Sequence, residues 1–141
     1  MVGNGTYLDY VRVFQGRPMP FAFVDLDRFD QNVVSVLARA GNHAVRVATK
    51  SVRCVALLRR IQASSPRYGS LMAFCAREAA FLAGKGLDDI LVAYPVLGEV
   101  SASGCLEALR AGKTITFMVD CAAHVDFLEG LGTSAQVQIP V

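Results

Sequence analysis

The feature that most constrains the fold is an alternation, from residue 43 onward, of short apolar segments with longer segments of helical spacing. Apolar residues on both faces indicate strands that are buried within a sheet. Such strands pair in parallel, because only a crossover helix returns the chain to begin a neighbouring strand in the same direction. The pattern predicts strands at 43–50, 68–75, 90–93, 114–119 and 136–139. It predicts intervening helices at about 52–63, 76–83, 99–111 and 122–130.

This alternation is typical of an α/β fold built from βα units. Units of about 22 to 28 residues match the repeat of an eight-fold barrel, in which about 250 residues make eight units. A doubly wound open sheet has the same alternation, and periodicity alone does not choose between the two folds. No predicted strand is followed by a glycine-rich dinucleotide motif or a P-loop, which weakens the nucleotide-binding version. We therefore predict a partial (β/α)8 TIM barrel with about four βα units and a fifth strand.

A shorter segment precedes the barrel pattern. Its spacing predicts a helix over 7–15, a strand at 21–24, and a second helix that has Asp27 as N-cap and ends at Gly41. The chain has 141 residues, which suits one domain. It ends on a predicted strand, and 53% of its residues are hydrophobic. We therefore expect residues 1–141 to be the N-terminal part of a longer barrel, whose further strands would cover the open edges.

Composition argues against several classes of partner and site. Charged residues make up 18% of the chain, and its net charge of +2 comes from dispersed basic residues, so no nucleic-acid partner is expected. No apolar run reaches the roughly 18 residues of a membrane span. Residues 1–6 lack the basic and apolar parts of a secretory signal, which favours a cytoplasmic location. The cysteines form no C-x-x-C pair and the two histidines are scattered, so we expect no metal ligand and interpret His124 as a surface residue.

Lys50 is the residue that most strongly suggests chemistry. It ends the first predicted barrel strand and is followed at once by a polar turn. Side chains at the carboxyl ends of barrel strands face the reaction site. A lysine that is partly desolvated there loses its proton more readily and becomes a nucleophile that can form a Schiff base with a carbonyl. The alternative is a solvated surface lysine, the usual state of this residue type.

Several motifs together resemble the amino-terminal barrel of the fold-type III pyridoxal-phosphate enzymes. They are residues 21–27 (FAFVDLD), Asn32, residues 46–53 (RVATKSVR), residues 78–82 (EAAFL) with Gly86, and residues 88–95 (DDILVAYP). The resemblance runs from about residue 20 to 139. It is nearest to the group of D-threonine aldolase, D-serine dehydratase and amino-acid deaminase, and alanine racemase is more distant.

The resemblance implies a role for Lys50 as the residue that holds pyridoxal 5'-phosphate in a Schiff base. Arg46 lies four residues earlier, and even spacing would place it on the same strand face, beside the cofactor ring. An arginine paired with a carboxylate at the edge of the core is an equally weighted alternative. Tyr94, at the end of the third predicted strand, would contact the ring or the substrate, or else simply cap the core. Together these expectations assign Lys50 to catalysis, and Lys50, Arg46 and Tyr94 to cofactor binding.

The implied activity is a lyase or aldolase reaction at Cα–Cβ of a D-β-hydroxy amino acid. In this family the phosphate-binding loops, any divalent-metal ligands and a second catalytic group come from later strands and a carboxyl-terminal β domain, and the enzymes are often homodimers. Because residues 1–141 lack those parts, we expect this fragment to be inactive by itself. The alternatives are a non-catalytic protein that binds pyridoxal phosphate for homeostasis, and an amino-acid racemase.

Overall fold

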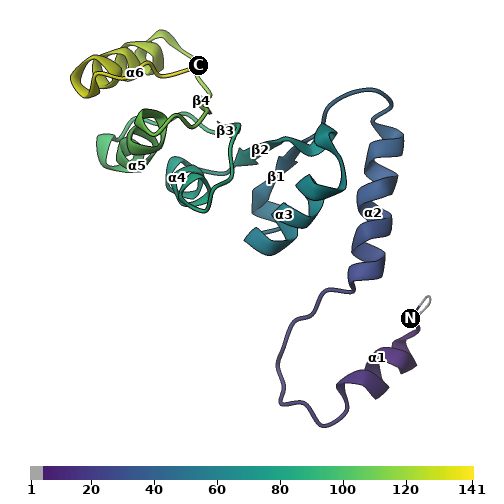
Figure 1. Cartoon of the computed structure of the whole chain (residues 1–141). Helices are drawn as coiled ribbons and strands as arrows, with labels where there is room; N and C mark the ends of the chain where they lie inside the picture. Colours follow the sequence, from purple (N-terminus) through teal and green to yellow (C-terminus); the bar gives the residue numbers. More distant parts are fainter. Residues whose placement is uncertain (1–4) are drawn as a thin grey trace.

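Four short parallel strands form the sheet around which the chain is organised (Figure 1). In this computed structural model, which describes residues 5–141, the strands are β1 (Arg46–Ala48), β2 (Ser70–Ala73), β3 (Ile90–Val92) and β4 (Ile115–Phe117). They lie in chain order, and each pairs in parallel with the next. A doubly wound sheet reverses its strand order at a switch point, whereas a barrel adds each strand beside the last. The observed order therefore favours the partial barrel, and the predicted α/β fold class is confirmed.

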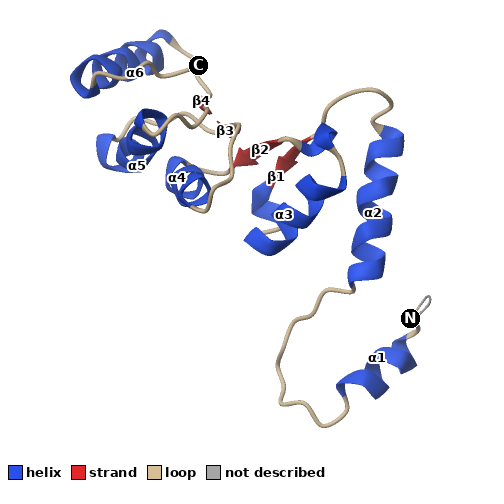
Figure 2. Ribbon diagram, in the orientation of Figure 1, coloured by secondary structure: helices blue, strands red, loops and turns tan. Residues whose placement is uncertain are grey.

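Helices cover one face of the sheet (Figure 2). After each strand comes a helix: α3 (Val55–Ser64), α4 (Ala76–Gly84), α5 (Glu99–Arg110) and α6 (Ala122–Ala135). One apolar cluster joins Leu58 of α3, Leu82 of α4, Cys105 of α5 and Leu128 of α6 to the sheet. The sheet side chains in this cluster are 0–1% exposed and are Leu71, Ala73, Ile90, Val92, Ile115 and Phe117. Their burial is the main stabilising contribution of the fold.

The other face of the sheet is only half covered. Ala48, Met72, Leu91 and Thr116 lie in one register row across the four strands, and each is half-buried. In a closed barrel this face is filled by side chains from the opposite strands. The described residues form four strands, so no opposite strand covers this row and it stays half-buried.

Helices α4 and α5 pack closely because Gly104 has no side chain. A Cβ atom on Gly104 would lie 2.8 Å from the Cβ of Ala80. Glycine lowers helix propensity, so a glycine inside a helix usually weakens it. The tertiary role of Gly104 explains why it is tolerated in the middle of α5.

In the amino-terminal segment, α1 (Tyr7–Phe14) and the linker lie apart from the sheet, whereas α2 (Leu26–Arg39) packs against it. Figure 1 shows α1 at the end of an extended linker and α2 beside α3. The N-cap of α2 is Asp25, whose side chain accepts a hydrogen bond from the Arg28 N–H, and not Asp27 as predicted. Val33 of α2 packs with Ile61 and Tyr68, so α2 is joined to the α3 side of the sheet. Residues 1–4, part of the segment judged for a secretory signal, lie outside the described residues.

Two predicted strands are not strands in the structure. Residues 21–24 are a loop, because the Phe21 and Phe23 rings pack on Phe14 of α1, with ring centroids 4.8 and 4.5 Å apart. Residues 136–139 also have no strand assignment. There the tail makes a hydrogen bond beside β4, from the Phe117 N–H to the Pro140 carbonyl at 2.9 Å. A single bond of this kind positions the tail without forming a strand ladder.

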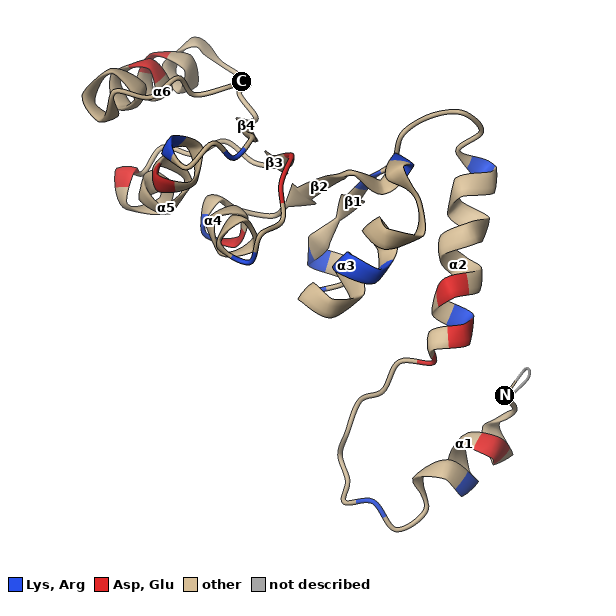
Figure 3. Cartoon of the chain, viewed as in Figure 1, with Lys and Arg blue, Asp and Glu red and all other residues tan. Residues whose placement is uncertain are grey.

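Charges of both signs are spread along the chain (Figure 3). Helix α3 carries the basic residues Arg59 and Arg60, whereas α6 carries the acidic residues Asp126 and Glu129. Among the described residues, no helix is long and apolar enough to cross a membrane.

Candidate functional site

The carboxyl ends of β1, β2 and β3 surround a small cavity of about 240 Å³. Its lining residues come from the last positions of these strands and the loops that follow, and they are Ala48, Lys50, Met72, Ala73, Phe74, Ala93 and Tyr94. Ala48 and Met72 belong to the half-covered row of the sheet, so the cavity opens on that face. The cavity therefore occupies the place where barrel enzymes hold their reacting groups.

Lys50 and Tyr94 are brought together at this cavity through Phe74. The Lys50 Nζ lies 5.8 Å from the centroid of the Phe74 ring, and the Phe74 and Tyr94 rings meet edge to face with centroids 5.1 Å apart. An ammonium group near an aromatic face is attracted by the ring quadrupole. The amine therefore lies near one aromatic ring at the carboxyl edge of the sheet. Lys50, Phe74 and Tyr94 are all exposed, so the position of Lys50 also agrees with the alternative of a solvated lysine.

The backbone around Lys50 differs from the prediction in one respect. Strand β1 ends at Ala48, and residues Thr49–Ser51 form a single 3-10 turn, so Lys50 projects from a turn and does not end the strand. The even spacing that placed Arg46 and Lys50 on one strand face therefore does not apply, because alternation of side chains requires continuous strand geometry.

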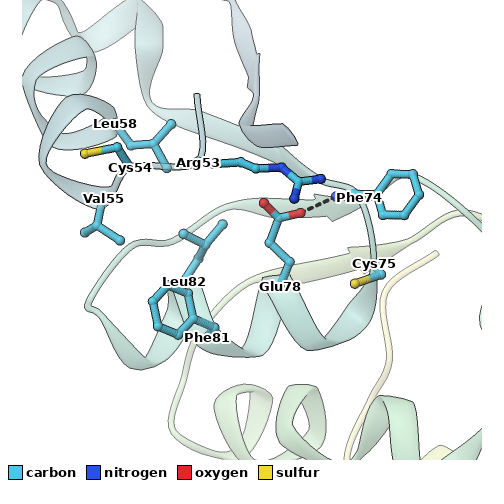
Figure 4. A pocket seen from close by; sticks show the side chains of 9 residues that line it. All are labelled: Arg53, Cys54, Val55, Leu58, Phe74, Cys75, Glu78, Phe81 and Leu82. Carbon is cyan, nitrogen blue, oxygen red and sulfur yellow. Dashed lines mark hydrogen bonds between the residues drawn. The ribbon is translucent and has the colours of Figure 1, made fainter. Parts of the chain in front are cut away.

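Thr49 and Glu78 brace this turn. Thr49 is fully buried, and its hydroxyl lies 3.1 Å from the Met72 carbonyl and 2.8 Å from Glu78 Oε1. The other Glu78 oxygen accepts a hydrogen bond from the Phe74 N–H at 2.7 Å (Figure 4). The Glu78 carboxylate, in the first turn of α4, therefore links Thr49, which precedes Lys50, to Phe74, whose ring lies near the Lys50 amine.

Neither Thr49 nor Glu78 was predicted as a site residue. The resemblance included Glu78 only as part of a motif, and its position in a first helical turn suggested no more than a favourable interaction with the helix dipole. A threonine directly before the candidate lysine was the available signal. Its significance depends on a contact between residues 29 positions apart, which no local pattern reveals.

Glu78 also lines a second cavity, of about 340 Å³ (Figure 4). Its polar lining includes Arg53 and Glu78, and Figure 4 shows the Arg53 side chain extending toward the Glu78 carboxylate. The Arg53 Nε donates a hydrogen bond to the Lys50 carbonyl at 3.1 Å. Arg53 also has a φ of 46°, in the left-handed region, which lets the chain turn from the 3-10 segment into α3.

Arg46 does not join the cavity. Its guanidinium donates hydrogen bonds to the carbonyls of Leu71 and Asp89, and it forms an ion pair with the Asp89 carboxylate, each at 3.0 Å. Asp89 directly precedes β3, so this arrangement lies at the amino ends of the strands, opposite Lys50. The expectation that Arg46 lies beside a cofactor ring does not agree with this position. The observed pairing matches the alternative of an arginine bound to a carboxylate at the edge of the core.

The chemistry of the cavity suits part of pyridoxal phosphate. Lys50 offers the amine that an aldehyde requires, and Phe74 and Tyr94 offer surfaces for a flat ring. A phosphate group is usually held by backbone N–H groups or by arginine. Arg53 lines the second cavity and not this one. The cavity residues therefore fit the aldehyde and ring ends of the cofactor better than its phosphate.

Comparison with solved structures finds proteins of similar fold. No protein-family model and no curated protein sequence matches the chain. Among solved structures, the crystal structure of D-threonine aldolase from Filomicrobium marinum is similar, with a TM-score of 0.76 and 21% sequence identity. The match covers 86% of this chain and 33% of the aldolase chain. D-threonine aldolase belongs to the group that the sequence motifs resemble, and this protein shares the fold of about a third of that enzyme.

Proposed function

We propose that this chain is the cofactor-holding part of a pyridoxal-phosphate enzyme, with Lys50 as the residue that forms the Schiff base. The observation that carries the proposal is the placement of Lys50 and Tyr94 around one cavity at the carboxyl edge of a parallel sheet. The fold shared with D-threonine aldolase supports it. That support concerns the fold, since the two sequences are 21% identical.

When bound, pyridoxal phosphate supplies an electron-withdrawing ring that labilises the bonds at Cα of an attached amino acid. The contribution of this chain is to place an amine at the aldehyde and to shape the space around it. Lys50 would hold the cofactor through its Nζ, and as a free amine it would hold or move a proton at the same position. Phe74 and Tyr94 offer ring surfaces beside the space that the cofactor would enter, and the Thr49–Glu78 brace holds the turn that carries the amine.

The substrate class we propose is a D-β-hydroxy amino acid, cleaved or dehydrated at Cα–Cβ. Two observations support it, namely the fold shared with D-threonine aldolase and the sequence motifs that resemble this group of enzymes. The chain spans 33% of the aldolase chain, so we expect cofactor binding by residues 1–141 without turnover. Tyr94 takes the cofactor-binding role in this proposal, and Arg46 takes a structural role at the opposite edge.

Reductive trapping tests the proposal directly. The protein is mixed with pyridoxal phosphate, reduced with borohydride, digested and mapped by mass spectrometry. We expect the reduced adduct on the peptide that contains Lys50, with Lys85 and Lys113 unmodified at equal cofactor concentration. An adduct spread evenly over the lysines and the terminal amine, or none at Lys50, would overturn the assignment of Lys50.

A further inference from the structure

A second group of reactive side chains lies after β4, away from the residues proposed to hold the cofactor. Asp120, Cys121 and His124 bring a carboxylate, a thiol and an imidazole together, and their ligand atoms all lie within 4.8 Å of one another. No metal ligand was predicted from the sequence, because the cysteines are unpaired and no spacing matches a known zinc motif, and His124 was interpreted as a surface residue. The D-C-x-x-H run at a strand-to-helix junction was nevertheless a signal in the sequence.

Local backbone structure explains why these three side chains meet. Cys121 is the N-cap of α6, and the His124 N–H donates a hydrogen bond to its carbonyl at 3.1 Å. Asp120 and His124 are four residues apart, and the His124 Nδ1 lies 2.9 Å from Asp120 Oδ1. The first helical turn therefore folds the imidazole back over the two preceding residues.

The accessibility of the group suits an ion that enters from solvent. The His124 side chain is 12% exposed, which restricts its orientation, whereas that of Asp120 is 63% exposed. Cys121 makes no side-chain hydrogen bond to the helix backbone, although many N-cap residues do. The thiol thus lies at an exposed position without the usual capping role.

The ligand types select the class of ion. Thiolate and imidazole ligands suit Zn²⁺ and similar transition metals, whereas Mg²⁺ and Ca²⁺ prefer oxygen ligands throughout. Zinc bonds of about 2.0 to 2.3 Å in a tetrahedron place the ligand atoms roughly 3.5 Å apart. The ligand atoms now lie within 4.8 Å of one another, so a bound ion requires them to approach to that spacing. Thiolate and carboxylate together carry two negative charges, which offset the positive end of the α6 dipole.

We propose that Asp120, Cys121 and His124 bind a Zn²⁺ ion through one carboxylate oxygen, the thiolate sulfur and one imidazole nitrogen. Binding displaces the thiol proton to solvent, and water fills the fourth tetrahedral position. The site follows β4 and so lies on the carboxyl side of the sheet, as Lys50 does. It requires neither pyridoxal phosphate nor Lys50, so the two proposals stand or fall separately.

Cobalt substitution provides the main test. The full chain is freed of metal with a chelator, kept reduced, and titrated with Co²⁺ and then with Zn²⁺, without pyridoxal phosphate. We expect a thiolate-to-cobalt charge-transfer band and tetrahedral d–d absorption, saturating at one equivalent and lost when Zn²⁺ displaces Co²⁺. Absence of the charge-transfer band would overturn the proposal.

Matched variants locate the site. Cys75 is also an exposed N-cap residue, of α4, and His43 is the other histidine of the chain, so each provides a control. We expect C121S and H124A to weaken Zn²⁺ binding at least about 10-fold, and C75S and H43A to leave it unchanged. Equal losses in the controls, or full affinity in C121S, would refute the site. Circular dichroism verifies that each variant is folded. Zn²⁺ binding is also measured for D120N, in which a neutral amide oxygen replaces the carboxylate at this exposed position.

Discussion

The carboxyl and amino edges of the same sheet both carry charged residues, but they are arranged differently. At the carboxyl edge, Lys50 lines an open cavity beside aromatic rings. At the amino edge, Arg46 and Asp89 pair with each other and with backbone groups of neighbouring strands. The difference indicates that the amino edge contributes to stability, whereas the carboxyl edge leaves reactive groups accessible.

Asp88 extends the arrangement at the amino edge. Its Oδ1 accepts hydrogen bonds from the Thr114 N–H at 2.7 Å and the Asp89 N–H at 2.8 Å, so it joins the segments that enter β3 and β4. The Lys113 Nζ lies 3.7 Å from its other oxygen. A similar role at the carboxyl edge falls to the Thr49–Glu78 brace, which holds the turn but does not engage the Lys50 amine.

The largest expected effect is at Lys50. The K50M variant keeps an unbranched side chain but removes the amine, and we expect trapping of pyridoxal phosphate to fall to background. Lys85 is the matched control, because its Nζ lies 5.5 Å from the Phe81 ring, much as Lys50 lies over Phe74. Mass spectrometry after borohydride reduction measures both variants. If K85M loses as much adduct as K50M, the adduct is not specific to Lys50, and the proposed difference between the two amines is wrong.

The brace should affect both stability and the site. In T49V the buried hydroxyl is replaced by a methyl group, which leaves the Met72 carbonyl and Glu78 without this partner, at a cost of about 1–3 kcal/mol in the free energy of unfolding. Because the turn then loosens, we expect adduct formation at Lys50 to slow about 10-fold. Urea unfolding and timed trapping measure the two effects. T116V, half-buried on the open face, is the control. An unchanged trapping rate would show that the brace does not position Lys50.

Arg46 separates stability from cofactor binding. R46M removes hydrogen bonds to two carbonyls and the pair with Asp89, and we expect about 1–2 kcal/mol lower unfolding free energy. Trapping at Lys50 should be unchanged where the variant is folded. A folded R46M protein that no longer forms the adduct would instead support the original expectation that Arg46 acts near the cofactor.

The smallest expected effect is a pH dependence at the amino edge. Burial works against ionisation of Asp88, but the Thr114 and Asp89 N–H groups and nearby Lys113 outweigh it and lower its pKa. The unfolded-state pKa of an aspartate is about 3.9. A lower folded-state pKa makes the folded protein more stable at pH values above about 3.9, and this added stability is lost as the pH falls through the folded-state pKa. The effect is modest, since the side chain is 48% exposed. Urea unfolding from about pH 6 to about pH 3 should be less pH-dependent in D88N than in the unchanged protein. Identical profiles would exclude Asp88 as a contributor.

Much of the architecture followed from the sequence, with characteristic errors. The four helices after the strands begin within about three residues of their predicted starts, since apolar spacing and turn residues act locally. Residues 21–24 have the composition of a strand, yet the phenylalanines pack on α1 and the segment pairs with no strand of the sheet. Lys50 and Tyr94 were predicted as site residues and do line one cavity. Their roles remain predictions.

Near neighbours in the chain set the hydrophobic period and the turns, so the order and type of the main elements, and a lysine near the end of the first strand, could be predicted from the residues alone. The groups that meet across the sheet could not be predicted in this way. The tertiary structure placed Glu78 against Thr49 and Arg46 against Asp89, contacts that span 29 and 43 positions of the chain. Such pairings depend on strand register and on where each strand ends. Because β1 ends at Ala48, Lys50 lies on a turn at the carboxyl edge of the sheet. Arg46 is the first residue of β1 and lies at the amino edge.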